Sequence, residues 1–183
     1  MRIISRHNVH PYSKRGVPDH TDGPPVRRLY HGGEGHSDDR PVDCVTCGRE
    51  VARFLHSLRV GVTERGPATS TTDTFISGGT TPPCLQWRDV LVLYWDDVSD
   101  NSGVVTGLQE AGIPVRMMKD DDIEDVATAR SDVVWVAGGH RVRGLERKVI
   151  VCLEDLKLEL FSSIRLDLMS RCTSQLVTVS PDN

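Results

Sequence analysis

Long hydrophobic runs are missing from this sequence of 183 residues. No apolar stretch approaches the roughly 20 residues that a membrane-spanning helix needs. The first residues, Met1-Arg-Ile-Ile-Ser-Arg-His7, also lack the apolar core of a secretory signal peptide. These absences predict an intracellular protein, cytoplasmic or nuclear, that has no membrane partner.

Paired cysteines are lacking as well. The chain has five cysteines, an odd number, and three of them are isolated in the sequence: Cys84, Cys152 and Cys172. Without a secretory signal, such a set favours reduced thiols over a disulfide framework.

A strong positive charge is also absent. The formal net charge is -4, which argues against a generally basic surface for nucleic acid but leaves a local basic groove possible. The length fits one domain with one substantial core.

The chain contains no phosphate-binding loop of the type Gly-x-x-x-x-Gly-Lys-Ser/Thr. Its two glycine-rich pieces, Gly32-Gly-Glu-Gly35 and Gly78-Gly79, are not followed by the lysine that contacts the nucleotide's phosphates. We therefore expect no independent ATPase activity.

Two segments have little to bury. Residues 1–25 mix histidine, proline, glycine and charges without apolar periodicity, which predicts a disordered N-terminal arm. Residues 62–83 are rich in threonine, serine, glycine and proline, which predicts a flexible insertion. Residues 26–183 are predicted to form one domain around this insertion.

Strands and helices alternate in that domain. Val90 to Tyr94 is a continuous apolar run, typical of a buried parallel strand, whereas Cys47, Val51 and Leu55 recur at helical spacing. The expected strands are 26–30, 90–94, 114–118, 132–137, 148–153 and 176–179, and the expected helices are 44–61, 104–111, 120–129 and 155–171. The alternation predicts an α/β fold, a mostly parallel sheet with helices on both faces.

A polar loop lies between two of these strands. It runs from Gly138 to Glu146 and carries His140, Arg141 and Arg143. Loops held by buried parallel strands often carry phosphate-binding and catalytic groups. An ordinary solvated loop explains the same composition, and the spacing alone leaves both interpretations open.

The loop His140-Arg-Val-Arg-Gly-Leu-Glu146 resembles motif V of superfamily 1 helicases of the UvrD/Rep type, and is also similar to the helicase-like part of Schlafen proteins. Upstream, Asp89 to Tyr94 and Leu108-Gln-Glu-Ala-Gly-Ile-Pro-Val115 resemble motif IV and the turn that follows it. Downstream, Leu168 to Val179 resembles motif VI. The resemblance implies a RecA-like second domain of the P-loop NTPase class.

The resemblance also implies roles for single residues. Arg171 would be an arginine finger that reaches the γ-phosphate, and Gly144, Glu146 and Arg143 would bind the nucleotide. His140 and Arg141 would contact DNA or RNA. ATP with Mg²⁺ would bind only when an N-terminal RecA-like ATPase domain completes the site.

Two departures from the family pattern favour an alternative function. Gly138 stands where a threonine commonly precedes the motif V histidine, and Trp95-Asp96-Asp97 stands where an arginine often follows the motif IV strand. The alternative is a non-catalytic module that binds nucleic acid or protein. Arg171 and Glu146 would then be ordinary surface charges.

A possible metal site needs a separate interpretation. Cys44-Val-Thr-Cys47 is half of a zinc pattern, and His31 and His36 lie just upstream. The order of histidines before cysteines reverses the usual one, and Cys47 also fits the apolar face of the predicted helix. The sequence alone therefore favours core cysteines and no metal, with zinc as the alternative left open.

Overall fold

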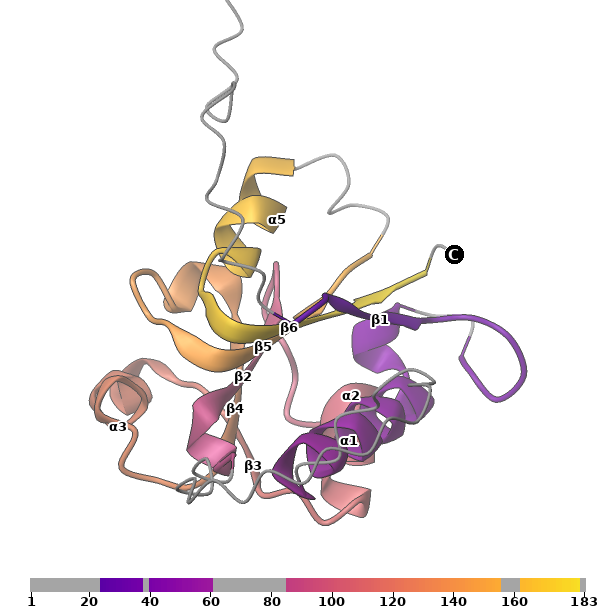
Figure 1. Ribbon diagram of the computed structural model, residues 1–183, viewed down its shortest axis with the longest axis horizontal. Coiled ribbons are helices and arrows are strands. Elements are labelled where there is room, and N and C mark those ends of the chain that lie inside the picture. Colours follow the sequence, from indigo (N-terminus) through magenta and orange to yellow (C-terminus); the bar gives the residue numbers. More distant parts are fainter. Residues whose placement is uncertain (1–23, 38–39, 61–84, 156–161, 182–183) are drawn as a thin grey trace, which may run out of the picture.

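The computed structural model describes residues 24–37, 40–60, 85–155 and 162–181. It contains one six-stranded sheet in which every pair of neighbouring strands is parallel (Figure 1). The strand order is β1-β6-β5-β2-β4-β3. The strands are β1 (Arg27–Tyr30), β2 (Val90–Tyr94), β3 (Val115–Met117), β4 (Val134–Gly138), β5 (Arg147–Leu153) and β6 (Cys172–Ser180).

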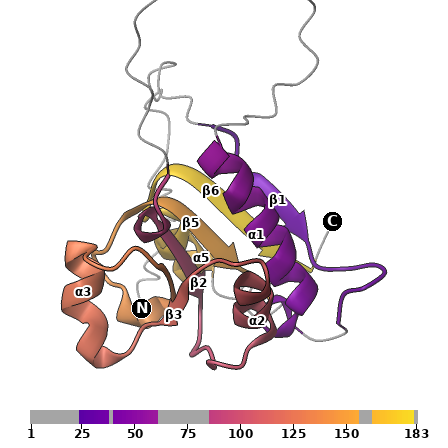
Figure 2. The ribbon, with the colours of Figure 1, turned by 90° about the horizontal axis from the view of Figure 1, so that it is seen from below.

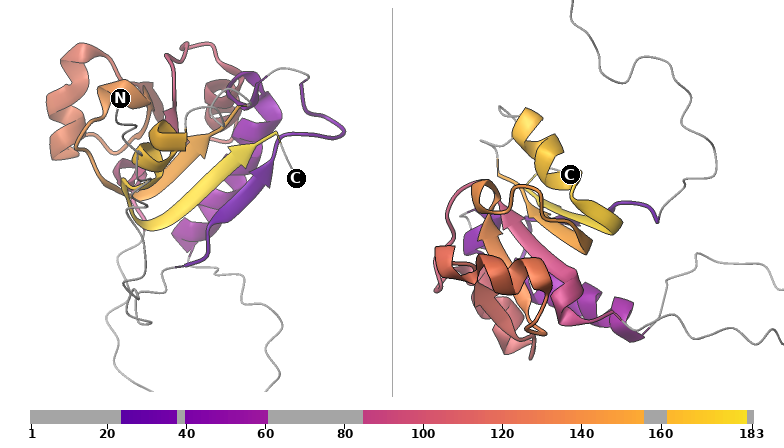
Figure 3. Two further views of the ribbon diagram at one scale, coloured as in Figure 1. Left: turned by 90° about the horizontal axis from the view of Figure 1, so that it is seen from above. Right: turned by 90° about the vertical axis from the view of Figure 1, so that its left-hand side faces the viewer.

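Helices cover both faces of the sheet, as the sequence predicts. On one face, α1 (Val45–Val60) and α2 (Gly103–Glu110) lie side by side (Figure 2). On the other face are α3 (Ile123–Thr128) and α5 (Ser162–Met169), and α5 lies across the sheet from α1 (Figure 3).

Side chains that point alternately to the two faces of the sheet divide the apolar core into two clusters. Val90, Val92 and Tyr94 of β2 face α1 and α2, whereas Leu91 and Leu93 face the side of α3 and α5. Successive strand side chains point to opposite faces of a sheet, so a strand covered on both faces must be apolar throughout. That is why all five residues of β2 are buried.

The helices α1 and α2 cross at very short range because glycines line the contact. A Cβ atom added to Gly107 would lie 2.8 Å from the backbone nitrogen of Arg49 and 2.9 Å from the Cα of Gly48. Gly103, at the start of α2, has similar contacts with the backbone of Asp43 and Cys44. The start of α2 therefore packs directly on the backbone that leads into α1.

Most predicted elements are confirmed, with shifts at their ends. The strand predicted at 90–94 coincides with β2, whereas β6 begins at Cys172, four residues before the predicted start at 176. The helix predicted at 155–171 is described only as α5, and Asp155 continues the extended chain after β5. The predicted insertion at 62–83 and nearly all of the predicted arm at 1–25 lie outside the described residues.

The directions of the connections mark the place where a ligand crevice is expected. From β2 the chain proceeds through α2 toward β3, whereas from β5 it proceeds through α5 toward β6, on the opposite side of the sheet order. Adjacent parallel strands whose connections diverge leave a crevice at their carboxyl ends, where α/β proteins bind ligands. Here that position is the end of β2 and β5.

Candidate functional site

A buried carboxylate occupies the carboxyl ends of β2 and β5. Asp155, which is 5% exposed, accepts hydrogen bonds at Oδ2 from the Tyr94 hydroxyl at 2.8 Å and from Trp95 Nε1 at 3.0 Å. Arg40 Nη1 donates to the Tyr94 hydroxyl at 3.3 Å. Two aromatic donors therefore orient one acid at the position expected for a ligand.

This arrangement changes the ionisation of Tyr94. Burial, followed by the hydrogen bond and the charge of Asp155, raises the pKa of the Tyr94 phenol to about 12. The protonated phenol is favoured because its ionised form would be desolvated and would face a carboxylate.

We expect Tyr94 to titrate apart from an ordinary phenol. The folded-state pKa of Tyr94 lies above the usual value of about 10. The protonated Tyr94 hydroxyl therefore stabilises the folded state fully below pH 10, and this stabilisation is lost as the pH rises toward 12. A spectrophotometric titration of phenolate absorbance should show one ionisation near pH 12 that Tyr94→Phe removes. A wild-type curve that matches the Tyr94→Phe curve above pH 11 would contradict the hydrogen bond to Asp155.

His140 and Arg141 lie together at the end of β4 beside acidic residues. Arg141 Nε donates to Asp97 Oδ1 at 3.2 Å, its Nη1 pairs with Asp120, and His140 Nε2 lies 3.6 Å from Asp97 Oδ1. Arg141, Asp97 and Asp120 line a cleft of ≈ 490 Å³. Arg141, predicted to contact nucleic acid, is thus already paired with two carboxylates within the chain.

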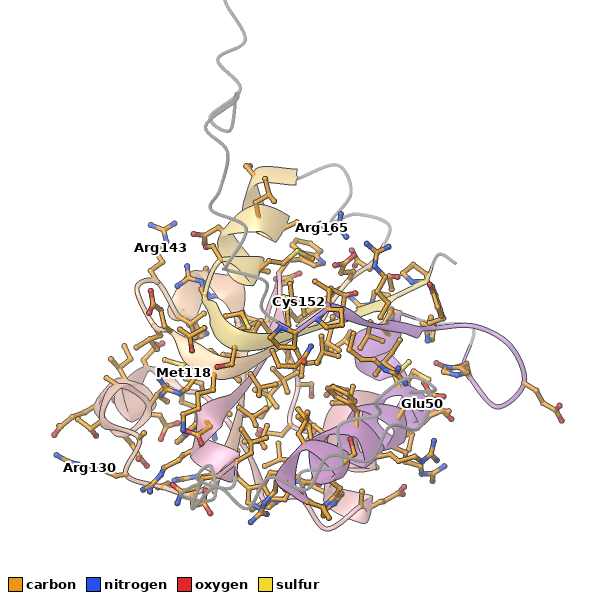
Figure 4. All side chains as sticks on the ribbon, viewed as in Figure 1. Glu50, Met118, Arg130, Arg143, Cys152 and Arg165 are labelled. Atoms are coloured by element: carbon orange, nitrogen blue, oxygen red, sulfur yellow. The ribbon has the colours of Figure 1, made fainter. Side chains whose placement is uncertain are left out.

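The second half of the predicted loop, from Arg143 to Glu146, does not lie beside His140 and Arg141 at the end of β4. Arg143, Gly144 and Glu146 are exposed, and the Arg143 side chain projects away from the body of the domain (Figure 4). They lie on the crossing that returns the chain from the carboxyl end of β4 to the amino end of β5. The structure therefore does not gather the predicted nucleotide-binding and nucleic-acid-binding residues around one point.

Arg171 is held inside the domain. Its side chain is 7% exposed, donates to the backbone oxygen of Val142, and pairs with Asp167 Oδ2 at 2.7 Å. The Arg171 carbonyl also accepts a hydrogen bond from Arg147 N at 3.1 Å. In this conformation the guanidinium anchors the polar loop to α5.

Four potential metal ligands meet beyond the carboxyl end of the edge strand β1, at the same end of the parallel sheet as Asp155. One ligand atom from each of His31, His36, Cys44 and Cys47 lies within 4.8 Å of all the others. The histidines flank a turn after β1 in which Gly33 and Gly35 have φ of 90° and 89°. The cysteines lie at the start of α1.

The two thiols of this cluster have different environments. Burial opposes ionisation of Cys44, but the backbone N–H groups of Cys47 and Ser37 lower the pKa of its thiol to about 6. Burial, together with the adjacent Cys44, raises the pKa of Cys47. One thiol is therefore acidic and its neighbour is not.

The sequence contained the signal for this cluster, because all four ligand types lie within one short segment. The order of histidines before cysteines does not prevent the four side chains from meeting. A strand, a glycine turn and a helix start bring the residues together in either order.

Comparison of the chain with protein-family models, with curated proteins and with solved structures found no match. Among the described residues, no helix is long and apolar enough to cross a membrane.

Proposed function

We propose that this chain is the RecA-like second domain of a superfamily 1 helicase-like ATPase. It would contribute nucleic-acid contacts to an N-terminal ATPase domain that binds ATP with Mg²⁺. Its motif VI-like Arg171 would reach that domain only after leaving Val142 and Asp167. One observation carries the proposal. The segments that resemble motifs IV, V and VI belong to four strands that are consecutive in the sheet, β6, β5, β2 and β4.

That adjacency is relevant because the segments are far apart in sequence. The motif IV-like strand β2 hydrogen-bonds to both strands of the motif V-like unit, with Leu91 opposite Trp135 of β4 and Ile150 of β5. The motif VI-like strand β6 pairs with β5. In the helicase family, the corresponding motifs act on one nucleotide and one nucleic-acid strand, so the strands that carry them must lie near one another in the sheet.

The exposed loop provides a testable contact. Arg143 is exposed and has no ion-pair partner among the residues that the structure describes. An exposed guanidinium on a short loop is suited to a phosphate group, which it neutralises with release of counterions. Arg141 must first exchange Asp97 and Asp120 for phosphate.

We expect the purified chain to bind fluorescently labelled single-stranded DNA or RNA in a salt-dependent manner. Arg143→Ala should weaken binding at low salt and reduce the slope of log affinity against log salt by about 0.7, the value for one phosphate contact on a single strand. Fluorescence anisotropy at several salt concentrations measures both quantities.

Arg130→Ala is the matched control. Arg130 is 65% exposed and paired with Glu124, and it projects from a different part of the surface than Arg143 (Figure 4). An equal loss for Arg130→Ala would indicate nonspecific charge effects. Absence of binding at any salt concentration would refute the nucleic-acid contact.

A specific observation favours the second candidate, a non-catalytic binding module. The Trp95-Asp96-Asp97 segment supplies the carboxylate that neutralises Arg141, in the position where the helicase family often has a cation. The discriminating observation is whether the parent gene encodes a Gly-x-x-x-x-Gly-Lys-Ser/Thr loop upstream of this chain. Its presence supports the ATPase partner, whereas its absence favours the non-catalytic module.

A further inference from the structure

We propose that His31, His36, Cys44 and Cys47 bind one Zn²⁺ ion in a closed, structural site. The proposal is independent of the helicase-like function. It rests on the distances between the ligand atoms, on their burial and on a carboxylate behind one histidine.

The distances are those of a tetrahedral site. His31 Nδ1 lies 3.2 Å from Cys47 Sγ, and His36 Nδ1 lies 3.5 Å from Cys44 Sγ and 3.4 Å from Cys47 Sγ. Zinc–sulfur and zinc–nitrogen bonds of about 2.3 and 2.0 Å place adjacent nitrogen and sulfur ligands about 3.5 Å apart in a tetrahedron. Small adjustments of the side chains therefore complete the coordination.

Burial indicates a structural ion. His31 is 8% exposed, Cys44 1% and Cys47 0%, and the His36 side chain is 7% exposed. Four protein ligands leave no open coordination position for a substrate, which distinguishes structural zinc from catalytic zinc. Zn²⁺ held by two thiolates and two neutral imidazoles forms a neutral Cys₂His₂ centre, and any thiol proton still present before binding is released to solvent.

The carboxylate behind one histidine supports the assignment. Glu50 Oε1 of α1 lies 3.7 Å from His36 Nε2, the ring nitrogen that faces away from the cysteines. Metal-bound histidines commonly direct their second ring N–H toward a carboxylate, which fixes the tautomer. Glu50 lies on the same side of the molecule as the loop after β1 (Figure 4).

Ordinary core packing does not explain the arrangement. A buried cysteine packs as a small apolar group, and Cys47 alone fits that role on the inner face of α1. Core packing gives no reason for two imidazoles to direct Nδ1 at the same sulfur atom, Cys47 Sγ. A shared cation explains why both rings turn inward.

The ion would join two elements that otherwise have little contact. The strand β1 has four residues and pairs within the sheet only with β6 among the described strands. Zinc would attach the chain leaving β1 to the first turn of α1, and so stabilise the edge of the sheet.

We expect the full chain, expressed in zinc-supplemented medium, to contain one zinc ion per molecule by elemental analysis. Cobalt substitution should produce the intense visible bands of tetrahedral Co²⁺ and a thiolate-to-cobalt charge-transfer band. These spectra report on the wild-type chain and do not depend on whether a variant folds. Less than one tenth of an equivalent of zinc, or only the weak absorption of octahedral cobalt, would overturn the proposal.

Variants test the ligand set. Cys44→Ser should remove the charge-transfer intensity of one thiolate, whereas Cys152→Ser, at a buried thiol in the other core cluster, should leave the cobalt spectrum unchanged.

Glu50→Gln should weaken zinc affinity by about 10–100-fold, as loss of a supporting carboxylate does. Glu110→Gln, on α2 with Arg49 as its partner, is the control for a lost surface charge. Equal zinc affinity in Glu50→Gln and wild type would overturn the role of Glu50, and an unchanged Cys44→Ser spectrum would overturn the site.

Discussion

Replacing Arg171 with alanine is expected to lower the free energy of unfolding by about 2–3 kcal/mol, because a buried carbonyl loses a charged donor. Val142, whose oxygen accepts the bond, is 0% exposed, and in the variant this oxygen would keep only the hydrogen bond from Leu145 N at 3.0 Å. The ion pair with Asp167 adds little, because Asp167 is 61% exposed and its charge is screened by solvent. Urea unfolding followed by tryptophan fluorescence measures the change.

Two further variants test whether the loss at Arg171→Ala comes from these contacts. Arg171→Lys should recover only part of the loss, because one ammonium group does not reproduce the planar fork that contacts both Val142 and Asp167. Arg130→Ala, at an exposed arginine with its own carboxylate partner, should stay within about 0.5 kcal/mol of wild type. An equally small effect at Arg171 would contradict the anchor and leave the residue available as the arginine finger that the resemblance implies.

Replacing Gly107 with alanine is expected to lower the free energy of unfolding by about 1–3 kcal/mol through overpacking. The new Cβ would meet backbone atoms of α1, including Arg49 N at 2.8 Å, and a backbone is much less able to move than a side-chain end. Alanine favours helix by up to about 1 kcal/mol over glycine, so a net loss requires the helices to separate. Chemical unfolding of the variant measures the balance.

The control for this substitution lies on the same helix. Gln109→Ala changes an exposed position of α2 and should alter stability by less than about 0.5 kcal/mol. Stabilisation by Gly107→Ala would mean that helix propensity outweighs the contact, and would contradict the close crossing of α1 and α2. Since Gly103 of α2 packs on the backbone of Cys44, separation of the helices should also weaken zinc binding.

The polar loop illustrates the limit of sequence reasoning about function. The pattern correctly predicts a loop between two buried strands, because apolar runs and polar breaks are local properties. It does not reveal that the loop crosses the sheet from one end to the other, which separates His140 and Arg141 from Arg143 and Glu146. Nor does it show that Asp97 and Asp120 neutralise Arg141, since those partners come from other connections.

The sequence by itself determined the fold class and the central strands. A continuous apolar run such as Val90 to Tyr94 has only one favourable environment, a strand buried on both faces, and the helical spacing of Cys47, Val51 and Leu55 predicts α1. Only the tertiary structure decided which distant polar groups meet. The turn after β1 brings His31 and His36 to the two cysteines at the start of α1, and the ends of β2 and β5 bring Tyr94 to Asp155. Which polar side chains meet depends on how the helices and strands pack together, not on the residue pattern within one element. Burial of the apolar core drives that packing, and the polar groups at the ends of the elements follow it.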